Sequence, residues 1–251
     1  LVPLVAGILM IFLQRSRMWQ RWVSMTAATV LVIISVSLVK TVHTDGILSL
    51  NMGGWPAPFG ITLVADMLSA LLVLASSIVC LTCLIYAFGA IGEKHERHYL
   101  YPFLMFLVCG VHGSFLTGDA FNLFVFFEVM LISSYVLLSL GGQRVQLRES
   151  LKYVVINMVA STLFVVAIAY LYSIAGTLNM AHLSERVATA GQDGLLTTVS
   201  LLFFVVFATK AALFLFVWLP GSYSAAPAPI AAIFAALLTK VGIYAILRFF
   251  T

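Results

Sequence analysis

Three charged residues stand inside long apolar stretches of this sequence. Glu128 lies in FNLFVFFEVMLISSY, Lys210 in LLFFVVFATKAALFLFVWLP and Lys240 in AAIFAALLTKVGIYAIL. If these stretches cross a lipid bilayer, each charge costs several kcal/mol unless it faces protein or water. A charged residue found there is therefore a candidate for function.

One carboxylate and two amines at comparable depth could move protons. Desolvation weakens the hold of a buried lysine on its proton, and a nearby carboxylate strengthens it. Glu128 beside Lys210 would therefore let a small change of geometry load or release a proton. Lys240 could pass the proton along a water-filled cleft, which a permanently charged Arg could not do. The alternative is a static ion pair that holds helices together, although buried ion pairs stabilise weakly.

The composition of the chain is that of a membrane protein. Hydrophobic residues make up 63% of the sequence and charged residues 9%, whereas a soluble domain carries about a quarter charged residues. Eight apolar runs recur, each suited to a membrane helix of about 20 residues, and none alternates as barrel strands do. We expect an all-α, polytopic transmembrane bundle of about eight helices. The runs are Leu1–Leu13, Trp22–Val42, Gly60–Phe88, Leu100–Leu116, Phe121–Leu140, Tyr153–Ile174, Leu195–Leu219 and Ile230–Phe250.

Both ends of the sequence are typical of a fragment. The first apolar run is short and does not begin with Met, and its Arg cluster follows the run, which is the reverse of a signal peptide. The last run stops at Thr251 without a polar tail. We therefore expect a first transmembrane helix that has lost a few residues and a chain that is cut at its other end.

Basic residues divide unequally between the two sides of the predicted bundle. By the positive-inside rule, the side with more of them faces the cytoplasm, which puts the N-terminus outside. No basic surface is left over for nucleic acid. The inner set is Arg15, Arg17, Arg21, Lys94, Arg97, Arg144, Arg148 and Lys152, and the outer set is Lys40, Arg186 and Arg248.

Two external connections have structure of their own in this prediction. Thr44–Phe59 is rich in Gly and Pro and alternates in part, which suggests a small β-hairpin. Gly176–Gly194 suggests a short surface helix. Asp66 and Asp119 stand at predicted helix starts, where capping or turn roles are more common than transport.

Two further residues are candidates for a proton relay. His112 lies inside a predicted helix and could titrate near neutral pH, although a hydrogen bond within the bundle would also explain it. Lys152 begins a predicted helix and could lie at the mouth of an inward channel, or could simply be an orientation signal. Cys80 and Cys83 are best explained as packing residues. No stretch has the spacing of a phosphate-binding loop, a nucleophile elbow or a zinc site, so we expect no metal or cofactor.

These motifs together resemble a known family, the antiporter-like membrane subunits shared by Mrp-type multisubunit Na⁺/H⁺ antiporters and complex I, the NADH:quinone oxidoreductase. The resemblance covers nearly the whole chain. It rests on Glu128 in its apolar stretch, on ATKAALF with Lys210 followed by WLPGSYSAAPAP, and on LLTKVGIYAILRF with Lys240. The stretches PFGITLVADMLSALLV and GTLNMAHLS, with Ser222–Tyr223, are most similar to the D-type member of Mrp antiporters.

The resemblance implies a fold of about fourteen helices with two inverted five-helix repeats, of which this chain covers the first eight helices. Residues 1–99 would form three N-terminal helices, and residues 100–251 the first repeat with the proton path. By the same resemblance, Glu128 tunes the proton affinity of Lys210, Lys210 is the central carrier, and Lys240 connects it onward.

The resemblance also implies an interrupted helix around Lys210. Many members of the family carry a Pro between this lysine and the Trp-Leu-Pro, but LFLFVW has none and is one residue shorter. The sequence therefore leaves a broken and a continuous helix both open.

Two functions follow from the resemblance. One is a subunit of a monovalent cation (Na⁺)/proton antiporter in the bacterial plasma membrane, a secondary transporter working with membrane subunits of the Mrp A, B, C, E, F and G types. The other is a proton-pumping subunit of a complex I-like or hydrogenase-type complex. A purely structural scaffold would require three inert buried charges. Because no set of converging oxygen ligands is evident, we assign protons and not Na⁺ to Glu128, Lys210 and Lys240.

Overall fold

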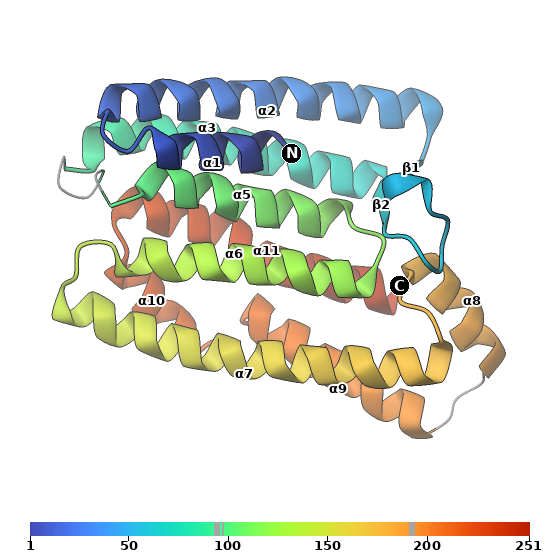
Figure 1. Ribbon diagram of the computed structural model, residues 1–251. Helices are drawn as coiled ribbons and strands as arrows, with labels where there is room; N and C mark the ends of the chain where they lie inside the picture. The colour runs from blue at the N-terminus through green and yellow to red at the C-terminus, as the bar shows by residue number, and fades with distance from the viewer. Residues whose placement is uncertain (93–95, 97, 191–193) are drawn as a thin grey trace.

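The chain folds into a bundle of roughly parallel and antiparallel helices with one small hairpin at its end (Figure 1). The computed structural model describes residues 1–92, 96, 98–190 and 194–251. The helices are α1 Val2–Phe12, α2 Arg17–Asp45, α3 Met67–Ala90, α5 Leu100–Leu116, α6 Ala120–Ser139, α7 Arg144–Ala175, α8 Met180–Ala190, α9 Gly194–Ala211, α10 Trp218–Ala225 and α11 Ala228–Phe250.

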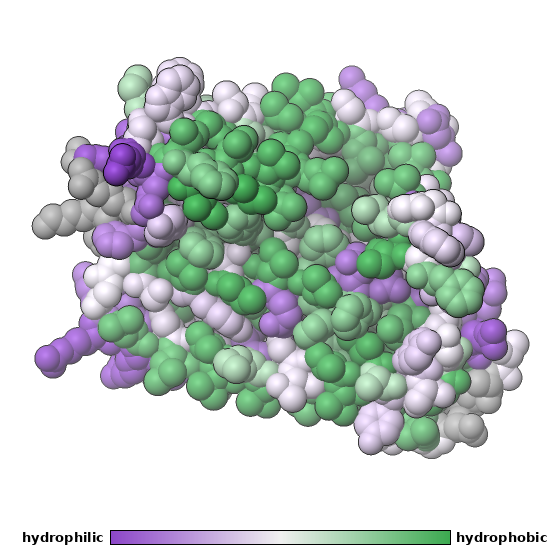
Figure 2. All heavy atoms as spheres, viewed as in Figure 1, coloured by the Kyte–Doolittle hydropathy of each residue, from purple (hydrophilic) through white to green (hydrophobic). Residues whose placement is uncertain are grey.

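Six of these helices are long and apolar enough to cross a membrane, namely α2, α3, α6, α7, α9 and α11. Figure 2 shows apolar side chains along the middle of the bundle, with hydrophilic ones gathered toward both ends. The predicted all-α transmembrane bundle is therefore confirmed. Two of the eight predicted runs are shorter apolar helices, α1 with 11 residues and α5 with 17. At 1.5 Å per residue, α1 spans about 16 Å and is too short to cross a bilayer alone.

The turns and helix starts where most of the predicted inner basic residues are found lie at one end of the bundle. The α1–α2 turn, the α6–α7 loop and the start of α7 are together at the left of Figure 1, and the hairpin and α8 are at the right. Lys94 and Arg97 lie outside the described residues. Arg21 does more than orient the chain, because its guanidinium forms an ion pair of 2.5 Å with the buried carboxylate of Glu96.

The predicted hairpin exists, but its second strand lies later in the chain than expected. β1, Leu48–Asn51, pairs in antiparallel register with β2, Thr62–Ala65. The helix predicted to begin at Gly60 therefore begins at Met67, because its first residues are used as a strand. Asp66 ends the strand and caps α3, with its carboxylate accepting a 2.8 Å hydrogen bond from the Ser69 amide. The predicted surface helix within Gly176–Gly194 is α8.

The hairpin joins several helix ends on its side of the bundle. Gly118, in the α5–α6 turn, donates its amide to the Thr62 carbonyl at 2.9 Å, and the Met180 amide at the start of α8 bonds to the Gly118 carbonyl at 2.9 Å. Asp119 caps α6 by accepting a hydrogen bond from the Asn122 amide at 2.8 Å. The capping roles predicted for Asp66 and Asp119 are thus confirmed, and this end of the bundle is tied by backbone hydrogen bonds.

Helix α5 lies at the centre of the bundle, packed between α1, α3, α6 and α11. Its closest approach is to α6, where a Cβ added at Gly110 would lie 2.6 Å from the Met130 backbone nitrogen. Such a distance is too short for any side chain. The glycine therefore sets how near the two helices can come, as small residues do between membrane helices.

Gly110→Ala should destabilise the bundle, because the added methyl must push α6 away from α5. We expect a loss of about 1–3 kcal/mol, typical of overpacking, seen as a lower midpoint of thermal unfolding in detergent. Gly89→Ala in α3 is the matched control, since nothing lies within 4 Å of its added Cβ. Equal midpoints for the two variants would contradict this account of α5–α6 packing.

Candidate functional site

Lys210 is buried at the end of helix α9, just before the chain leaves the helical conformation. It is the penultimate residue of α9, and 4% of its surface is exposed. The backbone then leaves the helix at Ala212, whose φ is +55°, and α10 begins at Trp218. The break implied by the resemblance is therefore present although the sequence has no Pro there, and the continuous helix Leu195–Leu219 is wrong.

The break is held by groups that satisfy the last carbonyls of α9. The Thr209 carbonyl accepts hydrogen bonds from the Ala212 amide and from the Trp218 indole nitrogen, both at 3.2 Å. The Leu213 amide bonds to the Ala208 carbonyl at 3.0 Å. A helix end within a membrane requires such partners, because lipid provides none. Trp218 thus does part of what water would do at the end of a soluble helix.

A serine hydroxyl connects the half-buried carboxylate of Glu128 to the amine of Lys210. Ser161 of α7 donates to Glu128 Oε1 at 2.5 Å and accepts from Lys210 Nζ at 3.1 Å. None of the ion pairs between described residues joins Glu128 to Lys210 directly. The structure therefore brings together two of the predicted residues, and α6, α7 and α9 each contribute one member of the three-residue chain.

Aromatic rings surround this chain on one side. Lys210 Nζ lies 5.0 Å from the centre of the Phe127 ring, a distance typical of a cation–π contact. Phe127 packs in turn against Phe164 and Phe207 at ring-centre distances of 6.0 and 6.4 Å. The cluster continues through Phe203 and Phe249. These rings form an apolar wall, and the Lys210 amine packs against the Phe127 ring of this wall.

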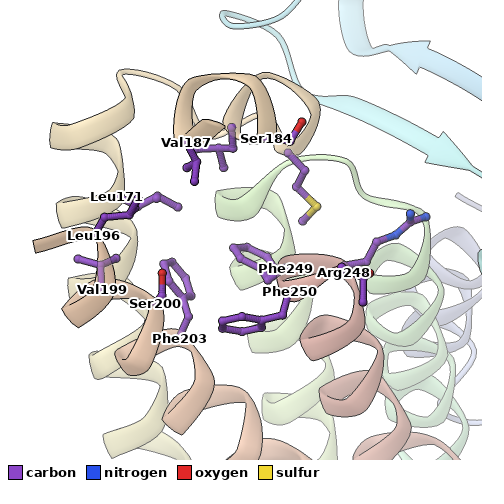
Figure 3. Close-up of a pocket in the computed structure, with 13 residues that line it drawn as sticks. Leu171, Ser184, Val187, Leu196, Val199, Ser200, Phe203, Arg248, Phe249 and Phe250 are labelled. Atoms are coloured by element: carbon purple, nitrogen blue, oxygen red, sulfur yellow. The ribbon is translucent and has the colours of Figure 1, made fainter. Parts of the chain in front are cut away.

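A cavity of about 620 Å³ lies beyond this wall, toward the hairpin end of the bundle. Its walls come from α7, α8, α9 and α11, and Phe203 and Phe249 are among its lining residues (Figure 3). Apart from Arg248, Ser184, Ser200 and Thr251, the lining side chains are apolar. The same two rings thus line the cavity and belong to the wall beside Lys210.

Lys240 is not joined to the other two charges. Its side chain is on the exposed face of α11 and donates to the Ala235 carbonyl at 2.6 Å and to Thr239 Oγ1 at 3.3 Å. The backbone of α11 does approach the lysine helix, since a Cβ added at Gly242 would lie 2.5 Å from the Ala211 nitrogen. The helix is thus adjacent to the site, while the Lys240 amine points away from Glu128 and Lys210.

The two candidate relay residues also lie apart from Lys210. His112 is buried in α5 with its Nε2 3.4 Å from Ser77 Oγ, and Ser77 lies 2.8 Å from Ser35 Oγ. This polar chain leads toward α3 and α2. Lys152 forms an ion pair with Glu149 at 3.1 Å at the start of α7. Neither residue has a hydrogen bond to Glu128 or Lys210 in the described part of the chain.

The sequence reasoning missed Ser161, Glu149 and the pairing of Asp66. Ser161 gives no signal, because single hydroxyl residues are common in membrane helices. Glu149 could have been found from its spacing to Lys152, which places the two on one helix face. Asp66 Oδ2 forms an ion pair with Arg248 Nη2 at a distance of 2.6 Å. Burial raises the pKa of Asp66, but hydrogen bonds from Ser69 and the Arg248 charge outweigh it and hold the pKa below its usual range.

Curated relatives and solved structures are similar to this chain along its whole length. A relative from Bacillus subtilis (strain 168), named as the D subunit of a Na(+)/H(+) antiporter, is 52% identical over all of this chain and 51% of the relative. The protein of the same name from Alkalihalophilus pseudofirmus is 53% identical, with the same coverage. The chain thus spans about half the length of the curated relatives it matches.

Two solved membrane complexes contain chains of the same fold. A chain of the Mrp complex from Dietzia sp. DQ12-45-1b matches with a TM-score of 0.88 and 31% identity, covering 99% of this chain and 47% of that one. A chain of the membrane-bound sulfane sulfur reductase, an archaeal respiratory membrane complex, matches with a TM-score of 0.93 and 30% identity, covering 97% and 50%.

A family model described as "NADH:quinone oxidoreductase/Mrp antiporter, TM" matches residues 117–251. This range contains Glu128, Ser161, Lys210 and Lys240, and it makes up more than half of the chain. The chain is a member of the NADH:quinone oxidoreductase/Mrp antiporter transmembrane family.

Proposed function

We propose that this chain is part of a subunit of a multisubunit monovalent cation (Na⁺)/proton antiporter and carries protons through Glu128 and Lys210. The observation that carries the proposal is the Glu128–Ser161–Lys210 chain inside the bundle, beside a broken helix. A lysine at such a position can lose its proton when the environment changes, which a fixed structural charge cannot do. The names of the antiporter relatives support the assignment.

Protons, and not Na⁺, are the ions assigned to this path. An Na⁺ site requires several converging oxygen ligands, whereas Lys210 Nζ has one hydroxyl and one aromatic face beside it among the described residues. The positive amine would also repel a cation. In this proposal, Na⁺ therefore crosses the membrane elsewhere in the complex, through a partner membrane subunit of the Mrp type.

In this proposal the protein is a secondary transporter and not an enzyme, placed in the bacterial plasma membrane with its N-terminus outside. The orientation is supported by the basic residues at the end of the bundle that holds Arg144, Arg148 and Lys152.

A second candidate function is a proton-pumping subunit of a redox-driven complex of the complex I or hydrogenase type. The high structural similarity to a chain of the archaeal respiratory complex favours it. The proton path through Glu128 and Lys210 would be the same in both cases, and only the source of energy would differ. The identity of the partner subunits separates the two functions.

Lys210→Ala and Glu128→Ala should each abolish Na⁺-dependent proton movement in inverted vesicles that carry the full complex. The first removes the proton carrier, and the second removes the charge that tunes it. Lys40→Ala is the matched control, since Lys40 is an exposed lysine at the end of α2, and it should exchange normally. If exchange persists in both site variants at matched assembly, the two charges are structural.

We also propose Lys240, on the helix adjacent to the site, as the onward proton carrier, so Lys240→Arg should be as inactive as Lys240→Ala in the same exchange assay. Arginine keeps the positive charge but does not release its proton at any accessible pH. Restored exchange in the arginine variant would instead mean that α11 needs only a fixed charge at this position. Both variants would be compared at equal amounts of assembled complex.

The affinity-purified complex should contain small membrane subunits and no flavin or iron–sulfur absorbance if it is an antiporter. Subunit masses measured by mass spectrometry, together with the visible spectrum, provide the check. Copurification of flavin-binding, iron–sulfur and quinone-site subunits would select the redox-driven alternative.

A further inference from the structure

We propose that the hydroxyl of Ser161 is the proton-transfer link between Lys210 and Glu128. This inference rests on the proposed proton path and names the group through which it runs. Ser161 Oγ lies between the two charged groups, 3.1 Å from Lys210 Nζ and 2.5 Å from Glu128 Oε1. Both distances are within the range of good hydrogen bonds.

The orientation of this hydroxyl is unusual for a membrane helix. Serine and threonine in helices commonly donate to the carbonyl three or four residues earlier. The adjacent Thr162 does so, bonding to the Met158 carbonyl at 2.9 Å, and Ser77 of α3 bonds to the Val73 carbonyl at 2.8 Å. Ser161 donates to Glu128 instead, across the gap between α7 and α6. Its proton is therefore committed to the acid and not to its own helix.

The surroundings leave the serine as the one polar connection between the charges. Among the described residues, Ser161 Oγ is the only hydrogen-bond partner of Lys210 Nζ and of the Glu128 carboxylate. The Phe127 ring covers another side of the amine, and Phe164, one helical turn after Ser161, packs on that ring. Ser161 is itself 8% exposed. A proton that leaves Lys210 in this geometry meets the serine oxygen first.

The transfer needs no group beyond these three. The Nζ–H bond of the Lys210 ammonium breaks as its proton binds Ser161 Oγ. At the same time the original O–H bond of Ser161 breaks, and the proton from that hydroxyl binds Glu128 Oε1. One positive and one negative charge become a neutral amine and a neutral carboxylic acid, and the serine keeps one proton throughout. The hydroxyl then points toward the amine and must rotate back before the next transfer. Two protons move in each event.

The test compares Ser161→Ala, Ser161→Thr and Thr162→Ala in the assembled complex in inverted vesicles, with Lys210→Ala beside them. Ser161→Ala removes the hydroxyl with little change of volume, and we expect it to slow Na⁺-dependent proton movement roughly 10²-fold or more, the range for loss of a proton-transferring group. Ser161→Thr keeps a hydroxyl and should retain most of the rate. Thr162→Ala removes a hydroxyl from the exposed face of the same turn and should change nothing.

Two further measurements separate proton transfer from packing. The rate of the wild type and of Ser161→Thr should fall in heavy water more than that of Ser161→Ala, because only the first two move protons through a hydroxyl. The pH profile of Ser161→Ala should also differ from that of the wild type. Wild-type exchange with a wild-type pH profile in Ser161→Ala would overturn the proposal, as would equal losses in the alanine and threonine variants.

Lys210→Ala distinguishes the failure of this inference from the failure of the proposed function. If Lys210→Ala abolishes exchange while Ser161→Ala does not, the result supports the proposed proton path and contradicts the serine link. If the complex with Lys210→Ala exchanges ions normally, the result contradicts both the proposed function and the serine link.

Discussion

Lipid supplies no hydrogen-bond partner, and the arrangement of this chain depends on that constraint. It forces the apolar runs into helices, whose backbone groups bond within the segment. It also makes any interruption of a helix in the bundle expensive unless another group fills the gap. The break after Lys210 is possible because the Thr209 carbonyl receives both the Ala212 amide and the Trp218 indole. The break in turn places the amine at a helix end, inside the protein.

The same constraint explains how charges are accommodated near this break. Glu128 and Lys210 are not in direct contact, and a hydroxyl of a third helix lies between them. The attraction between two charges weakens with distance, so the spacer leaves each charge less tightly held than a direct pair would. The Phe127 ring stabilises the amine without offering it a proton acceptor. In our proposal, this looser pairing is what lets the site gain and lose a proton.

The two ends of the bundle have different kinds of order. At the hairpin end, backbone hydrogen bonds and the Asp66–Arg248 ion pair join α3, the α5–α6 turn, α8 and α11. At the opposite end, the order comes from charged side chains: the Arg21–Glu96 pair links α2 to the connection after α3, and the Lys152–Glu149 pair lies within the first turns of α7. The proton path in our proposal runs between these ends. The cavity on the hairpin side is lined by Phe203 and Phe249, and both rings pack on Phe207, which packs on the Phe127 ring beside Lys210.

The sequence by itself determined the transmembrane bundle, the caps at helix starts and the placement of Glu128 and Lys210 within apolar helices, because apolar length and isolated charges are local properties of the chain. Only the tertiary structure decided three other features. The break at residues 212–217 forms without a proline, and one of the donors to the last carbonyls of α9 is a tryptophan side chain later in the chain. Ser161 became part of the site because three helices meet there. Lys240 points away from that site, because the side of a helix that faces its neighbours depends on packing between helices and not on the spacing of residues within one.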